Sequence, residues 1–200
     1  MAKRAPTDFH PDLTEDRLKF VASLIARGRN DALDRHDSSV GHNAWTTGTC
    51  AFAFGKFRIE EAASSGEHSW LGVLDDSNRF IFTIGEAPVR FYKGEAEDPT
   101  DRTLRQFYPE LKQLSLMLEG GYSRAHHMFR LAVETDEVGE IDRICLVVLA
   151  GTSVEFCWEI PYAPMLSAIF PVGSVPAEGV ELPPPAVRLS GKKSRDTDAA

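Results

Sequence analysis

The most regular stretch of the sequence runs from residue 128 to residue 160 and reads MFRLAVETDEVGEIDRICLVVLAGTSVEFCWEI. Apolar and polar residues alternate along it, and turns are expected at 138–139 and 150–152, where glycines interrupt the pattern. A two-residue turn at 138–139 pairs apolar residues on one face: Val133 with Ile144, Leu131 with Leu146, and Phe129 with Val148. The stretch therefore predicts antiparallel strands with one apolar face.

The second turn sets the expected position of the last strand in this stretch. A three-residue turn at 150–152 places Ile144 opposite Trp158 and Leu146 opposite Phe156, on the same apolar face. The other face then carries a row of opposite charges formed by Glu134, Arg143 and Glu159. Such cross-strand pairs contribute about 0.2 to 1 kcal/mol each, which supports this register.

A period of two also occurs upstream and predicts strands at 70–74, 79–84 and 87–92, with a tight turn at Gly85-Glu86. This pairing sets Val73 opposite Phe80 and Phe82 opposite Val89, on an apolar face. The opposite face presents aromatic, aliphatic and basic side chains, namely Trp70, Arg79, Ile81, Arg90 and Tyr92.

Helical spacing predicts a helical hairpin from residues 12–36 and 45–59, with a strand as the alternative for 51–54. Gly48 and Gly55 lie one heptad apart and could mark a line where another backbone comes close. A further helix is expected from residue 98 to 118, where Pro109 should kink or split it.

Together these elements predict an α+β fold: an N-terminal helical hairpin and two three-stranded antiparallel β-meanders separated by a helix. The expected organisation is a disordered N-terminus at 1–11, a single α+β domain at 12–160, and a Pro-rich, largely disordered C-terminal tail at 161–200.

Composition and charge indicate the compartment of the protein and the class of partner that it can bind. The chain is 42% hydrophobic and lacks both a membrane-length apolar run and a secretory signal, and its three cysteines are scattered, so we expect a cytoplasmic protein with reduced thiols. A net charge of -8 disfavours nucleic acid as a partner. Residues 1–58 hold nine basic against seven acidic side chains, so this part is favoured for contact with an acidic partner.

Catalytic signatures are missing from the sequence: GxSxG, P-loop and GxGxxG patterns do not occur, so no catalytic residue and no cofactor are predicted. One cluster, formed by Asp34, His36, Asp37 and His42, carries imidazole and carboxylate groups that could bind a divalent metal. Completed by Glu60 or Glu61, it would suit a metal-dependent hydrolase or nuclease. The alternative interpretation is a polar helix end followed by a solvated turn.

The sheet face with Trp70, Arg79, Arg90 and Tyr92 is the predicted interaction face. Aromatic side chains interleaved with arginines occur in protein interfaces and in single-strand nucleic-acid sites, and a helix could instead cover the face. The sequence favours a non-enzymatic protein-interaction or regulatory module that binds a protein partner or forms a homodimer. Single-strand nucleic-acid binding is the weaker alternative.

Two segments of this region, residues 84–92 and 131–136, resemble pieces of uncharacterised bacterial proteins of about 200 residues. The resemblance covers mainly residues 70–160. It implies a bacterial or mobile-element origin and no particular activity.

Overall fold

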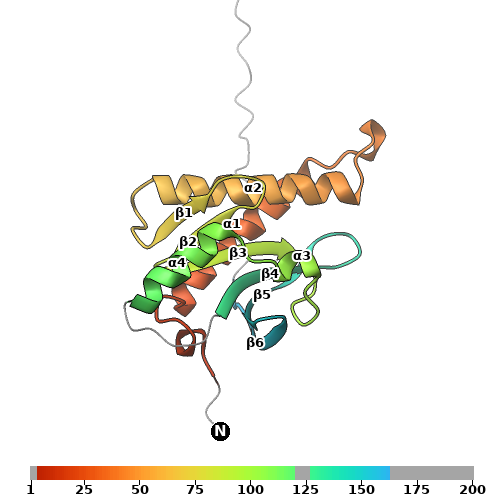
Figure 1. Cartoon of the computed structure of the whole chain (residues 1–200). Coiled ribbons are helices and arrows are strands. Elements are labelled where there is room, and N and C mark those ends of the chain that lie inside the picture. Colours follow the sequence, from red (N-terminus) through yellow and green to blue (C-terminus); the bar gives the residue numbers. More distant parts are fainter. Residues whose placement is uncertain (1–3, 120–126, 163–200) are drawn as a thin grey trace, which may run out of the picture. The chain divides into compact units, whose positions relative to one another are not determined.

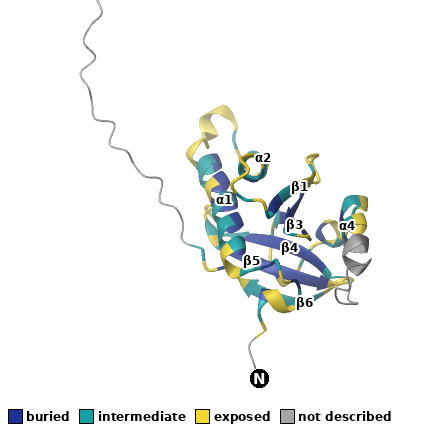
Figure 2. Cartoon of the chain, turned by 90° about the vertical axis from the view of Figure 1, so that its left-hand side faces the viewer, coloured by how far each residue is buried: buried dark blue, intermediate teal, exposed yellow. Residues whose placement is uncertain are grey.

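Helices pack on both faces of one sheet in the computed structural model, which describes residues 4–119 and 127–162 (Figures 1 and 2). The described helices are α1 (Glu15–Asp34), α2 (Ala44–Ser64), α3 (Asp101–Leu104) and α4 (Tyr108–Glu119). The strands of the sheet are β1 (Leu71–Asp75), β2 (Ile81–Ile84), β3 (Ala87–Lys93), β4 (His127–Thr135), β5 (Ile141–Ala150) and β6 (Ser153–Glu159). The predicted α+β class is confirmed.

The sheet order follows the sequence order from β1 to β6. Neighbouring strands are antiparallel except β3 and β4, which run parallel and pair from Val89 with Phe129 to Lys93 with Val133. Parallel neighbours need a long crossover, and here the segment that carries α3 and α4 supplies it. The two predicted strand triplets thus share one sheet.

Within each triplet the register follows from the turns. The three predicted pairs between β4 and β5 are confirmed, as is the pairing of Phe82 with Val89. The predicted position of β6 is wrong by two residues: Leu146 faces Trp158, because the turn is only Gly151-Thr152 and a bulge follows Val148. A two-residue shift keeps each side chain on its face, so Trp158 still packs against the core.

The first hairpin differs in a similar way. Val73 pairs with Phe82, where Phe80 was predicted. Phe80 precedes β2 and has a positive φ of 31°, so it lies outside the ladder although its ring is buried.

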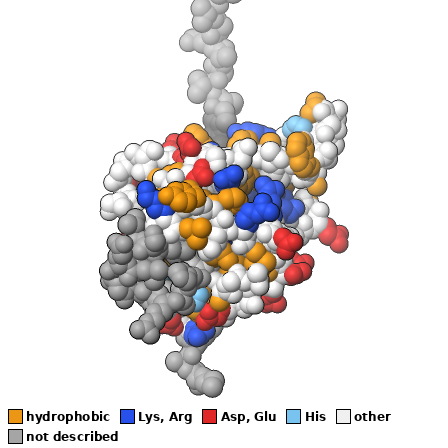
Figure 3. Space-filling model, viewed as in Figure 1, with side chains coloured by type: hydrophobic (Ala, Val, Ile, Leu, Met, Phe, Trp, Pro, Cys, Tyr) orange, Lys and Arg blue, Asp and Glu red, His pale blue; other side chains and the backbone are white. Residues whose placement is uncertain are grey.

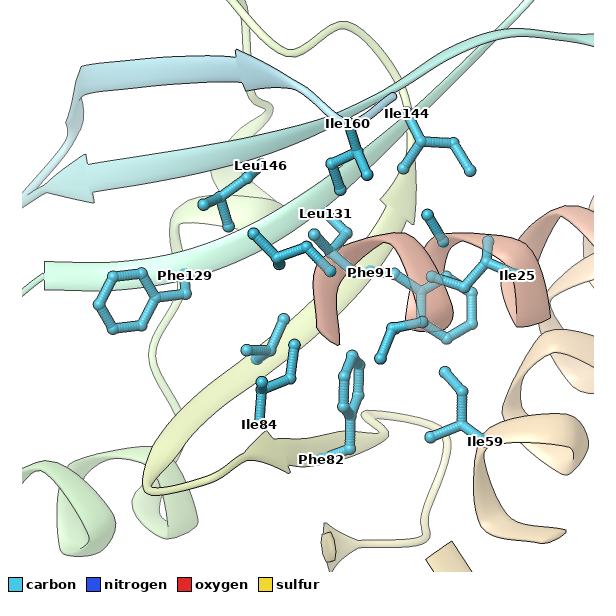
Figure 4. Packing of buried hydrophobic residues seen from close by; sticks show 14 of the residues in the cluster. Ile25, Ile59, Phe82, Ile84, Phe91, Phe129, Leu131, Ile144, Leu146 and Ile160 are labelled. Carbon is cyan, nitrogen blue, oxygen red and sulfur yellow. The ribbon is translucent and has the colours of Figure 1, made fainter. Parts of the chain in front are cut away.

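A core forms between the sheet and the helix pair α1 and α2 (Figure 4). Ile25 from α1 and Ile59 from α2 meet apolar side chains from β2, β3, β4 and β5, among them Phe82 and Leu131. Residues 51–54 are helical, so the strand alternative for them is wrong. A smaller cluster lies on the opposite face of the sheet and includes Ala132, Cys145 and Val147.

Close contact between α1 and α2 depends on glycines. A Cβ atom at Gly28 would lie 2.4 Å from the backbone nitrogen of Gly55, whereas a Cβ atom at Gly48 would meet no atom within 4 Å. Gly55 therefore marks a close approach as predicted, but its partner is Gly28, and Gly48 has no such role.

The helix predicted from residue 98 to 118 is divided into α3 and α4, as expected from Pro109. Pro109 lies in the first turn of α4, where its missing N–H costs no helical hydrogen bond, and α3 ends at Leu104. Near the N-terminus, α1 begins after Thr14, and Asp12 instead accepts a hydrogen bond from the backbone N–H of Glu86 at 3.1 Å. Asp12 thus ties the N-terminal segment to the β2–β3 turn.

Part of the segment predicted to be disordered packs against the domain. Residues 6–8 form a short 3-10 helix, η1 (Pro6–Asp8), and Pro6 is buried. Phe9 packs against Phe156, with ring centroids 4.8 Å apart and the rings tilted by 34°. The predicted C-terminal tail lies outside the described residues except for Pro161 and Tyr162. Within the described ranges, no helix has the length and apolarity needed to cross a bilayer.

We predict opposite effects of two Gly-to-Ala substitutions. Gly28→Ala forces α1 away from α2 and is expected to lower the free energy of unfolding by about 2 kcal/mol or more. Gly48→Ala removes only the entropic cost of a helical glycine. It is expected to raise the free energy of unfolding by up to about 1 kcal/mol. Urea denaturation of both variants measures the difference. Equal effects would contradict the contact between the helices.

Candidate functional site

A groove of about 730 Å³ opens between α2, β3 and the segment around α3. The first half of α2 contributes Trp45, Thr49 and Phe52 to its wall, and the segment around α3 contributes Thr100, Arg102 and Thr103. The sheet and its loops contribute the remaining polar and aromatic side chains, which include Asn78, Arg79, Arg90, Phe91, Tyr92, Lys93 and Arg130. Three of the four residues of the predicted interaction face, Arg79, Arg90 and Tyr92, therefore line one groove.

The groove is strongly basic. Five cationic side chains line it, namely Arg79, Arg90, Lys93, Arg102 and Arg130, and no Asp or Glu is among its described lining residues. This contrasts with a net charge of -8 for the whole chain. Figure 3 shows Lys and Arg side chains gathered beside hydrophobic ones in this region, with acidic side chains at the border of the patch. A cleft lined with one sign of charge concentrates ligands of the opposite sign.

A buried ion pair holds the floor of the groove. Arg130, with 1% of its side chain exposed, donates to the Glu110 carboxylate at 2.6 Å, and Glu110 is 2% exposed. Arg130 also donates to the carbonyl oxygens of Thr103 and Phe129. Burial lowers the pKa of Arg130, while the Glu110 carboxylate opposes that shift. The pair fastens α4 and the end of α3 to β4.

Arg90 is the neighbour of Arg130 across the parallel β3–β4 ladder. It donates to the carbonyl oxygen of Arg79 at 3.3 Å and to that of Arg105 at 3.1 Å, and it lies 4.0 Å from Glu110. Burial and the charge of Arg130 lower the pKa of Arg90 to about 10. The Glu110 carboxylate therefore lies within 4.0 Å of the guanidinium groups of both Arg90 and Arg130.

Aromatic rings line or support the groove. The guanidinium carbons of Arg79 and Arg90 lie 4.6 and 4.7 Å from the ring centroid of Phe107, so this ring positions both cations. Trp45, 75% exposed at the start of α2, and Phe52 give the groove an apolar wall. Burial raises the pKa of the Tyr92 phenol, whose hydroxyl donates to the carbonyl oxygen of Glu95.

Trp70, the fourth residue of the predicted face, lies on the other side of the sheet. It packs against Phe20 of α1, with ring centroids 5.8 Å apart, and Arg17 lies over its ring. Trp70 comes before the first residue of β1, so the strand alternation that placed it beside Arg79 does not apply. The prediction that Trp70 shares a face with Arg79, Arg90 and Tyr92 is therefore wrong, and only the last three line the groove.

Three residues of the predicted metal cluster, His36, Asp37 and His42, make hydrogen bonds to other residues of the α1–α2 hairpin. His36 Nδ1 lies 2.8 Å from Thr47 Oγ1, and His42 Nδ1 accepts from the backbone N–H of Asp37 at 3.1 Å. Asp37 accepts from Ser39, which lowers the pKa of the Asp37 carboxyl. Asp34 is the last residue of α1, and Glu60 and Glu61 lie toward the other end of α2. Among residues 4–119 and 127–162, no three His, Cys, Asp or Glu side chains are grouped so that they could hold a metal ion.

Sequence reasoning missed Trp45, Glu110 and Arg130. The predicted register placed Phe129 and Leu131 on the apolar face, so Arg130 had to point the other way. The pairing of β3 with β4, which brings Arg130 next to Arg90, left no signal in the local pattern.

Comparison with known proteins gives no relative: neither a family model, nor a curated protein, nor a solved structure matches this chain. The groove must be interpreted from its own chemistry.

We predict that Glu110→Gln lowers the free energy of unfolding by about 3 kcal/mol, because it leaves Arg130 buried without its counter-ion. Glu67→Gln, at an exposed position, serves as the control and should change stability by less than about 0.5 kcal/mol. Urea denaturation measures both. A loss as small as that of the control would show that the ion pair does not hold the groove floor.

Proposed function

We propose that this chain is a non-enzymatic protein-interaction or regulatory module whose groove binds an acidic segment of a protein partner. The observation that carries the proposal is the concentration of five cations in one groove of an otherwise acidic chain. Arginine is enriched in protein interfaces, and its planar guanidinium pairs well with carboxylates.

The exposure of the groove residues supports this proposal. Arg79, Lys93 and Arg102 are exposed, and none of them forms an ion pair with a residue in the described part of the chain. Trp45 offers an amphipathic surface that could cover an apolar residue of the partner. A flexible acidic segment would thus meet cations and apolar walls together.

The partner is either another protein or a second copy of this chain, and the proposed setting is the cytoplasm of a bacterium, with a mobile element as the alternative origin. Free thiols at Cys50, Cys145 and Cys157 agree with a reducing compartment. The local hydrogen bonds of His36, Asp37 and His42 give no support to the metal-dependent alternative.

We predict that Arg79→Glu with Arg102→Glu abolishes most of the affinity for an acidic peptide. The probe is a fluorescein-labelled peptide of about ten glutamates, and fluorescence anisotropy measures its binding to the full chain. Replacing two attractive charges with repulsive ones should weaken binding at least about tenfold, or about 1.4 kcal/mol. The affinity for the same peptide should also fall as salt rises.

Arg27→Glu with Arg35→Glu is the matched control, because it changes the net charge equally and both arginines are exposed and do not line the groove. It should leave the affinity within about twofold of the original. Equal losses in both variants would mean that net charge alone attracts the peptide, and no loss in either would remove the groove from the proposal. Mass measurements at several concentrations show whether the same double variant changes self-association.

A further inference from the structure

The positive charges that line the groove outnumber the described carboxylates that contact them. Arg90 and Arg130 face each other across β3 and β4, with side chains 13% and 1% exposed, and Glu110 contacts both. Like charges at directly opposed positions in a sheet are unfavourable. One carboxylate balances one of these two guanidinium groups, and Arg79 and Arg102 add further positive charge at the same groove.

We propose that the groove recognises a phosphate monoester on a side chain of the partner protein, which rests on the function proposed above. A phosphate monoester carries nearly two negative charges at neutral pH and three strong acceptor oxygens. A carboxylate carries one charge and two oxygens. The dianion therefore matches a site with several cations and no lining carboxylate better than a glutamate side chain does.

The described polar groups suit the same ligand. Arginine pairs with phosphate through two parallel N–H donors, and Arg79 and Arg102 are exposed residues of the groove lining. Asn78 and Thr49 add neutral donors to the lining. Trp45 and Phe52 form an apolar wall that suits an aromatic or aliphatic group next to the phosphate. Recognition of phosphorylated motifs by arginine clusters is a known mode of peptide binding.

Phenyl phosphate is the first probe, and phenyl sulfate is its matched monoanion. Isothermal titration of the full chain at pH 7.5 should give phenyl phosphate at least about tenfold higher affinity than phenyl sulfate. Arg79→Ala with Arg102→Ala should weaken phenyl phosphate about tenfold, and Arg27→Ala should not. Equal affinities for the two probes, or an unchanged affinity in the double variant, would overturn the inference.

The pH dependence provides a second readout. The second ionisation of a phosphate monoester occurs near pH 6, so the preference over phenyl sulfate should shrink between pH 7.5 and pH 5. The charged groups that face the ligand are Arg79, Arg90, Lys93, Arg102 and Arg130, with Glu110 behind two of them, and no histidine is among the described lining residues. A preference that stays constant over this range would contradict recognition of the dianion.

Two further ligands identify the source of the phosphate. A short peptide with one phosphotyrosine should bind more tightly than the same peptide with tyrosine, whereas adenosine monophosphate should bind no better than phenyl phosphate. Binding of the nucleotide alone would overturn the assignment to a protein side chain. If the oligoglutamate peptide binds through the groove and phosphate shows no preference, this inference fails and the proposed function stands. If neither peptide binds through the groove, both fail.

Discussion

The buried ion pair between Arg130 and Glu110 is the constraint on which the groove depends. Burying two charges costs solvation energy, and their attraction recovers that cost only when the remaining donors and acceptors are satisfied. Here Arg130 donates to the carbonyl oxygens of Thr103 and Phe129, and Glu110 also accepts from the backbone N–H of Phe107. The pair therefore fixes the path of the chain between α3 and α4.

That path determines which side chains meet in the groove. Carbonyl oxygens at the end of a short helix lack helical partners. Arginine donors from β3 and β4 bind those of Thr103 and Arg105, so the crossover lies against the parallel strand pair. Phe107 is then held where Arg79 and Arg90 can lie over its ring. The contacts that hold the α3–α4 segment against β3 and β4 thus also bring the arginine side chains together in the groove.

Local pattern predicted which strands are neighbours within each triplet, the register between β4 and β5, and the two long helices, because each depends on a short turn and a repeated apolar period. The register of β6 failed because the turn is one residue shorter than predicted and a bulge follows Val148, and these two changes together keep the apolar face. The register between β1 and β2 failed because Phe80 lies outside the ladder. The β3–β4 pair could not be predicted, since a long segment separates its strands and each triplet has two edge strands that could pair. The linear charge count likewise favoured residues 1–58 for an acidic partner, whereas the five cations of the groove come from residues 79–130.

The contrast between the acidic chain and its basic groove restricts what can bind there. At physiological ionic strength, charges act over about 8 Å, so a ligand inside the groove interacts mainly with the nearby cations. A long polyanion that extends beyond the groove meets the acidic side chains around it (Figure 3). A compact anion on a flexible segment avoids that repulsion and still reaches the arginines. The acidic side chains around the groove should therefore weaken the binding of extended polyanions relative to that of compact anions, which is the selectivity that the proposed recognition of a phosphate monoester requires.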